Sequence, residues 1–397
     1  MKKPAIEVAD IFRENLDKIG KISPEKWKVV NALTSCRTAR LGGHVYRCDN
    51  CAHEIISYNS CRNRHCPKCQ GLARIKWLDN RMKELLPVEY FHVVFTIPDI
   101  LNTTALCNKE VVYDILFRAV KETLLEASVN PKNIGARIGF LAILHTWGQN
   151  LLDHPHIHCV VPGGGLSDDG RRWISSKKGF LVSVKILAKL FRGKFLYYLK
   201  QAFHDHKLHF YGENKELEIP WMFQKLIDQA YAKEWVVYVK KPFSGPKQVL
   251  QYLGKYTHRV AISNHRIIDV KDGRVIFKWR DYKDGNKMKT MSVSVQEFMR
   301  RFLLHVMPKR FVKIRFYGLL SNRNKKEMLI KCRELLHEAS SDDETEEENP
   351  DTAESLMVGI TENDYLVCPE CQKGKMFIVM LIEPETISEN RDRIDSS

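Results

Sequence analysis

Six of the eleven cysteines lie within residues 36–69, and their spacing constrains the fold more than any other feature of the chain. Cys48 and Cys51 form one C-x2-C pair, and Cys66 and Cys69 form a second pair fourteen residues later. Each pair can fold into a tight knuckle, and four thiolates close a tetrahedral zinc site. We therefore predict a small N-terminal module in which these four cysteines bind one structural Zn²⁺ ion.

Additional ligands in the same stretch leave the number of zinc ions open. Cys61 precedes His65 by four residues, a spacing that allows both to bind one ion. The remaining candidates could form a second zinc site or replace ligands of the first. This possible second set consists of Cys36, Cys61, His53 and His65.

Basic side chains gather around the cysteine pairs. A zinc-stabilised module with a basic flank is suited to contact with DNA phosphates, and the alternative is an ordinary solvated surface. The predicted DNA-binding residues of this module are Arg62, Arg64 and Lys68.

The charge of the whole chain agrees with a polyanionic partner. The 397 residues carry a net charge of +15, and nine acidic residues with no Lys or Arg fall within 338–355. The rest of the chain is therefore even more basic, which favours binding to nucleic acid. The apolar runs are too short to cross a membrane, and the N-terminus has no signal-peptide pattern, so we expect a soluble intracellular protein.

The central part of the chain alternates between strand and helix patterns. Apolar stretches predict strands, amphipathic periodicity predicts helices, and Asp272-Gly273 and Asp284-Gly285 predict hairpin turns. The fold class that follows is α+β, with a central antiparallel sheet, flanking helices and a small N-terminal zinc-binding module. The predicted strands are 91–97, 138–147, 153–161, 235–239 and 311–317, and the predicted helices are 108–127, 182–205, 219–232, 295–305 and 321–337.

Composition divides the chain into four parts. We predict a helical and zinc-binding DNA-binding domain over 1–85 and a catalytic domain over 86–337. An acidic, disordered linker follows over 338–365. The last part, 366–397, is a short segment with the single pair Cys368 and Cys371, which is half of a zinc site and could be completed by another region or by none.

Two histidines stand two residues apart in a predicted strand. His156 and His158 therefore project from one face, as two metal ligands or a ligand and a base would. The alternative is that both histidines are structural.

Two tyrosines share one face of the helix predicted after Pro246. Tyr252 and Tyr256 are one turn apart, so both could pack in a core, or both hydroxyls could face the metal at the histidines. A tyrosine oxygen can be a covalent nucleophile, but with a pKa near 10 it needs help to attack a phosphodiester. A divalent metal can provide this help, and Lys255 and Arg259 could hold flanking phosphates.

Several stretches together resemble one known family. Residues 154–159 (HPHIHC) look like the His-hydrophobic-His motif of the HUH endonucleases, and 252–256 (YLGKY) resembles the paired-tyrosine helix of their two-tyrosine transposases. Residues 60–70 look like the zinc-binding domain of the insertion-sequence-ninety-one family. The stretches 305–309 and 314–318 look like C-terminal signatures of that family, although Phe316 replaces an expected His.

The resemblance implies a rolling-circle transposase with an HUH fold. Such an enzyme cleaves and rejoins single-stranded DNA at element ends and target through a 5′-phosphotyrosine, with Mg²⁺ or Mn²⁺ as catalytic metal. It also implies a third metal ligand, for which we favour His145, on the adjoining strand, over Gln149 and His154. The expected location is the bacterial cytoplasm, in association with the nucleoid.

Two other functions remain possible from the residues alone. A zinc-containing DNA-binding regulator would bind DNA without cleaving it, and its histidines and tyrosines would be structural. A metallohydrolase of small phosphoesters could use His156 and His158, but the chain lacks the Asp-rich ligand set of a two-metal site.

Overall fold

The computed structural model describes residues 6–240, 260–281, 284–340 and 367–385. Its centre is a five-stranded sheet in the order β12-β4-β5-β3-β8, in which every neighbouring pair is antiparallel. The predicted central antiparallel sheet is therefore confirmed. Its strands are β3 (Tyr90–Thr96), β4 (Gly139–Trp147), β5 (Asp153–Pro162), β8 (Val237–Lys240) and β12 (Ile314–Gly318).

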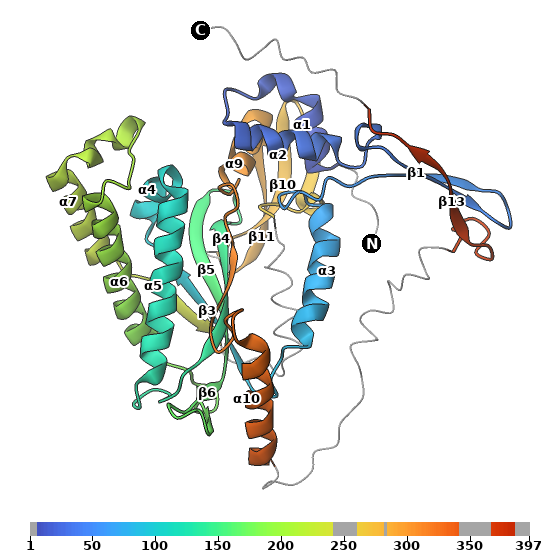
Figure 1. The fold of residues 1–397 in the computed structure, drawn as a ribbon. Helices are drawn as coiled ribbons and strands as arrows, with labels where there is room; N and C mark the ends of the chain where they lie inside the picture. Colours follow the sequence, from blue (N-terminus) through green and yellow to red (C-terminus); the bar gives the residue numbers. More distant parts are fainter. Residues whose placement is uncertain (1–5, 241–259, 282–283, 341–366, 386–397) are drawn as a thin grey trace.

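One face of this sheet is covered by helices, as Figure 1 shows. Alternate strand residues point to this face because the side-chain period of a strand is two. They include Phe91, Phe140 and Ile157, all of which are fully buried in the largest hydrophobic core. The covering helices are α4 (Asn102–Cys107), α5 (Lys109–Val129), α6 (Val184–His204) and α7 (Pro220–Ala232).

The intervening strand residues point to the opposite face. Tyr90, Leu141, Ile143 and Val160 form a smaller core there, against side chains of helix α3 (Cys69–Met82). Helix α10 (Lys325–Ser340) packs at the end of the sheet near the short strands β6 (Gly164–Leu166) and β7 (Trp173–Ser175). The rest of this face carries the histidines described below.

A second core joins the start of the chain to residues beyond 260. Phe12 lies edge-on against Phe302, with ring centroids 5.5 Å apart, and both are buried in this core. The predicted boundary near residue 85 therefore does not separate two independent cores. The elements involved are α1 (Val8–Glu14), α2 (Pro24–Ser35), β9 (Ile267–Lys271), β10 (Arg274–Asp281), β11 (Lys287–Ser294) and α9 (Val295–Leu304).

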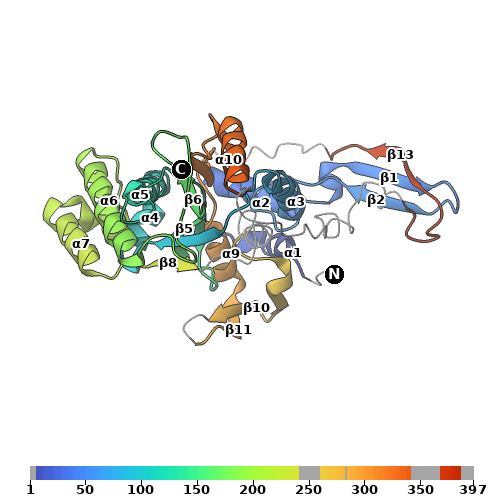
Figure 2. The same cartoon turned by 90° about the horizontal axis from the view of Figure 1, so that it is seen from below.

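A third sheet projects from the remainder of the molecule, as Figures 1 and 2 show. It has the order β13-β1-β2, from β1 (Gly43–Cys48), β2 (Glu54–Tyr58) and β13 (Met376–Ile382). The C-terminal segment was predicted as a separate part, but its strand pairs antiparallel with β1 and completes the N-terminal sheet. Most of the predicted acidic linker lies outside the described residues.

Candidate active site and zinc centres

Three histidines meet on the face of the central sheet that the helices α4–α7 do not cover. His145 on β4 lies directly opposite His156 on β5, and His158 follows on the same side of β5. One ring nitrogen from each of the three can be chosen so that all lie within 4.8 Å of one another. His145 and His158 are buried and His156 is half-buried. The structure thus brings the two strand histidines together with His145, the favoured third candidate, whereas His154 is outside the group.

Hydrogen bonds orient two of these rings. The Nδ1 atom of His156 lies 2.6 Å from the carbonyl oxygen of His154, so this nitrogen donates and Nε2 is left as the possible ligand atom. The Nδ1 atom of His158 lies 2.8 Å from Nε2 of His92 on β3. Metal-binding histidines generally have such a partner on the second ring nitrogen, because it fixes the tautomer and the ring orientation.

His92 was missed by the sequence interpretation. It is buried on β3, and its ring stacks on that of His158 with the planes 6° apart. Burial lowers the pKa of His92 to about 4, so the ring is neutral at pH 7. The available signal was a histidine within the apolar run Phe91–Phe95 of a predicted strand.

The donor set of the cluster fits a divalent transition metal. Neutral imidazoles are common ligands of transition metals such as Zn²⁺, Fe²⁺ and Ni²⁺, whereas Mg²⁺ and Mn²⁺ usually take oxygen ligands as well. Trp147 stacks on His145 at a centroid distance of 4.8 Å and shields this side of the cluster. Three ligands leave coordination positions that phosphate oxygens and water can fill.

The predicted catalytic tyrosines lie outside the described residues. This holds for Tyr252, Tyr256, Lys255 and Arg259, all of which fall within 241–259. The chain on both sides of this segment, however, is placed beside the histidines. Lys240 ends β8 opposite His92, and Val260 lines a pocket together with Trp147, the residue stacked on His145.

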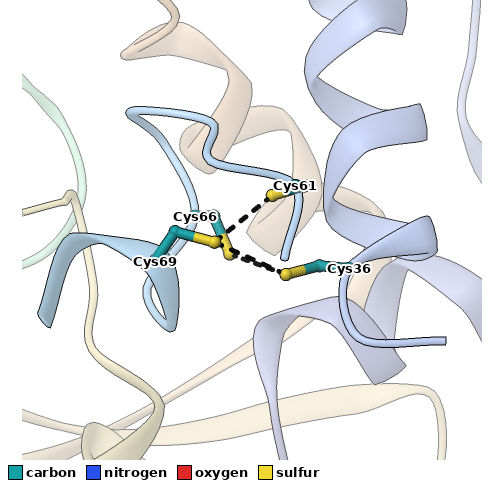
Figure 3. Close-up of side chains that lie close together, drawn as sticks. All are labelled: Cys36, Cys61, Cys66 and Cys69. Carbon is teal, nitrogen blue, oxygen red and sulfur yellow. Dashed lines mark hydrogen bonds between the residues drawn. The ribbon is translucent and has the colours of Figure 1, made fainter. Parts of the chain in front are cut away.

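The N-terminal cysteines form a tetrad of different membership from the predicted one. Cys66 and Cys69 are grouped with Cys36 and Cys61, and the four sulfur atoms all lie within 4.8 Å of one another. Figure 3 shows these four thiols converging. Cys36 directly follows α2, Cys61 and Cys66 lie in the loop before α3, and Cys69 is the first residue of α3. The expected four-cysteine site is therefore wrong, because β1 and β2 carry the pair Cys48–Cys51 away into the projecting sheet.

Two of the predicted DNA-binding residues have internal partners. Arg64 donates hydrogen bonds to the backbone carbonyls of Phe311 at 2.6 Å and Pro308 at 2.9 Å. Lys68 forms an ion pair with Glu7. Arg64 and Lys68 thus hold the cysteine tetrad against the rest of the protein, and of the three predicted residues only Arg62 is exposed.

His305 has a comparable structural role. Its Nε2 atom lies 3.0 Å from the carbonyl oxygen of Leu151, and its Nδ1 atom lies 3.2 Å from the hydroxyl of Thr146. A carbonyl can only accept, so Nε2 donates and Nδ1 accepts from the hydroxyl. His305 therefore fixes the β4–β5 connection beside the histidine cluster.

His53 and His65 are in neither of the cysteine groups formed by the described residues.

Comparisons with known proteins agree with this architecture. Residues 139–327 match a family model described as "Putative transposase", and residues 7–97 match one described as "Transposase zinc-binding domain". A "Putative transposase y4qJ" from Sinorhizobium fredii is 48% identical, with 97% of this chain and 98% of the relative covered. The transposase for insertion sequence element IS801 from Pseudomonas savastanoi is 27% identical, with 79% and 74% covered.

Among solved structures, the conjugative relaxase TrwC in complex with oriT DNA matches over 42% of this chain and 68% of the relaxase. The identity is 14% and the TM-score is 0.21, too low to bear on the site. No helix among the described residues has the length and apolar character needed to span a bilayer. On the sequence relatives and the two family models, the chain belongs to the insertion-sequence-ninety-one family of transposases, with an N-terminal zinc-binding domain.

Proposed function

We propose that this protein catalyses rolling-circle transposition by cutting and rejoining single-stranded DNA with a tyrosine nucleophile. The observation that carries the proposal is the cluster of three histidines, together with the described residues on either side of the segment that contains the tyrosines. Lys240 lies opposite His92, which stacks on His158, and Val260 shares a pocket with Trp147, which stacks on His145.

The reaction has the following balance. The hydroxyl oxygen of Tyr252 or Tyr256 attacks the scissile phosphorus and loses its proton. The bond from phosphorus to the 3′ oxygen breaks, and that oxygen takes up a proton to become a free 3′-OH. The downstream strand is then attached to the protein through a 5′-phosphotyrosine. In the reverse direction a 3′-OH attacks this phosphotyrosine, so that strands are rejoined without an external energy source.

The protein supplies orientation for this step. His145, His156 and His158 would hold a divalent metal that polarises the phosphate and stabilises charge on the leaving oxygen. Lys255 and Arg259 would bind the phosphates on either side of the scissile one and so fix the position of the DNA strand. The second tyrosine would hold another strand while the first is engaged. The metal would be Mg²⁺ or Mn²⁺, and phosphate oxygens and water would supply the oxygen ligands that both ions prefer.

The test is a covalent-adduct assay. Single-stranded DNA carrying an element end, labelled on its 3′ side, is incubated with the protein and Mn²⁺ and separated on a denaturing gel. We expect a slowly migrating species with wild type, none with the Tyr252→Phe/Tyr256→Phe double variant, and a reduced amount with one or both single variants. Tyr211→Phe is the matched control, because Tyr211 is 65% exposed on a distant part of the chain.

An adduct that persists in the double variant would overturn the tyrosine assignment. Binding of this DNA by wild type without any adduct would instead favour the DNA-binding regulator. A nicked product without attached protein would indicate that water, and not a tyrosine, is the nucleophile.

A further inference from the structure

A second group of four cysteines joins the two ends of the chain. Cys48 is the last residue of β1 and Cys51 lies in the turn that follows, whereas Cys368 and Cys371 lie just before β13, more than 300 residues later. The sulfur atoms of Cys48 and Cys371 are 3.7 Å apart, and those of Cys51 and Cys368 are 3.6 Å apart. A disulfide requires about 2.05 Å. Ligands at about 2.3 Å from zinc in a tetrahedron are about 3.8 Å from one another, which agrees with the observed spacing.

The backbone around the two pairs has matching geometry. The N–H of Ala52 donates to the carbonyl of Cys48, and the N–H of Gln372 donates to that of Cys368. Ala52 and Gln372, the residues that follow the second cysteine of each pair, both have left-handed φ angles, of 57° and 53°. Each pair is therefore folded as a tight knuckle, and the two knuckles face each other.

Backbone amides also point at the sulfur atoms. The N–H of Asn50 donates to Sγ of Cys48, and the N–H of Gly374 donates to Sγ of Cys371, both at 3.4 Å. Such bonds stabilise a thiolate over the neutral thiol. A Cβ atom on Gly374 would lie 2.5 Å from Sγ of Cys48, so only glycine allows the knuckles to close.

The projecting sheet has very little core to hold β13 in place. Its buried cluster contains only Cys48, Cys368 and Met376 among the described residues. Five consecutive β13 side chains, residues 377–381, are between 48% and 64% exposed. A three-stranded sheet without a hydrophobic core is at best marginally stable in water. Some other interaction must therefore hold the strand.

We propose that Cys48, Cys51, Cys368 and Cys371 bind a structural zinc ion, separate from the ion at Cys36, Cys61, Cys66 and Cys69, which fastens the C-terminal segment to the N-terminal hairpin. The matched zinc-binding family model ends at residue 97 and so contains only half of this ligand set. The proposal does not depend on the nuclease chemistry. It predicts two sulfur-bound zinc ions per chain.

The first measurement is the zinc content of the full-length protein by mass spectrometry, with the sulfur coordination from X-ray absorption. His156→Ala is used as the background so that zinc bound by the histidines is not counted. We expect two ions, each with four sulfur ligands at about 2.3 Å. Cys368→Ser/Cys371→Ser and Cys61→Ser/Cys66→Ser should each lose one ion, and Cys107→Ser, outside both groups, should lose none.

A variant that keeps all ligands makes the test independent of cysteine replacement. Gly374→Ala should lower the zinc content towards one ion, whereas Gly193→Ala, where a Cβ has nothing within 4 Å, should leave it at two. Amide hydrogen exchange should become fast along β13 in Cys368→Ser/Cys371→Ser. The proposal is overturned by one sulfur-bound zinc in the starting protein, by two disulfides at these cysteines, or by unchanged β13 protection after this ion is lost.

Discussion

The Nε2 atom of His92 lies 2.8 Å from Nδ1 of His158, with the two rings stacked at a centroid distance of 5.0 Å. His92 is on β3 and His158 on β5, so this contact crosses between neighbouring strands in the middle of the sheet. With Nε2 of His158 as a metal ligand, Nδ1 of His158 would carry the ring proton and donate it to Nε2 of His92. His92 is thus a positioning residue for the proposed metal ligand.

His92→Phe removes the acceptor and should weaken Mn²⁺ binding about 10- to 100-fold, the usual cost of losing such a partner. His92→Gln keeps an acceptor oxygen and should restore part of the affinity. Isothermal titration calorimetry with Mn²⁺ in the absence of DNA measures both effects. His204→Phe, at an exposed position of α6, is the control, and equal affinity of His92→Phe and wild type would contradict the role.

The assignment of His145 as third ligand gives a second prediction. His145→Ala should reduce adduct formation at low Mn²⁺ by tenfold or more, and higher Mn²⁺ should restore part of it because two ligands remain. His154→Ala should change the rate less than twofold. A reversal of these two results would move the third ligand to His154.

Replacing Arg62 and replacing Arg64 should have different effects, the first on DNA binding and the second on the stability of the fold. Arg64→Ala removes two hydrogen bonds from a charged donor, each worth about 1.5–3 kcal/mol, so Tm should fall by several degrees. The dependence of DNA affinity on salt should stay unchanged in the folded variant. Arg62→Ala should leave Tm unchanged and lower the salt slope by about one. A lower salt slope in Arg64→Ala would restore Arg64 as a phosphate contact.

Asp153 should make stability depend on pH. Burial raises the pKa of its carboxyl to about 7 from the usual value near 4, against a lowering effect of Lys109. The folded protein therefore binds this proton more tightly than the unfolded chain does. The stabilisation of the folded state by this tighter proton binding is fully present below pH 4. It is lost as the pH rises through about 7.

Asp153→Asn should consequently be more stable than wild type at pH 8, by roughly 1 kcal/mol per unit of pKa shift, and equally stable near pH 4. Urea unfolding at the two pH values measures the difference. Asp168→Asn, at an exposed position, is the control. A stability difference that is the same at both pH values would show that the carboxyl does not titrate as stated.

The central sheet was predictable because its strands carry strong local patterns. Residues 91–97, 138–147 and 153–161 were expected as strands and are β3, β4 and β5 within two residues at either end. The antiparallel hairpin of β4 and β5 also placed His145 beside His156, because a short connection leaves few registers.

The cysteine partners could not be predicted in the same way. A C-x2-C spacing indicates a knuckle, but nothing in the spacing says which second knuckle it meets. The partner of Cys48–Cys51 is far away at Cys368–Cys371, and a nearer pair at Cys66–Cys69 looked equally suitable. The internal hydrogen bonds of Arg64 could not be predicted for a related reason, since the carbonyls that it binds are more than 240 residues away.

The pairing of β1 with β13 has a consequence for synthesis of the protein on the ribosome. Cys48 and Cys51 are made early, whereas Cys368 and Cys371 are made more than 300 residues later. At about 5–20 residues per second, the first two thiols remain without their partners for tens of seconds. A chain released before residue 376 lacks the third strand of this sheet, so the completed sheet forms only in molecules translated through residue 382.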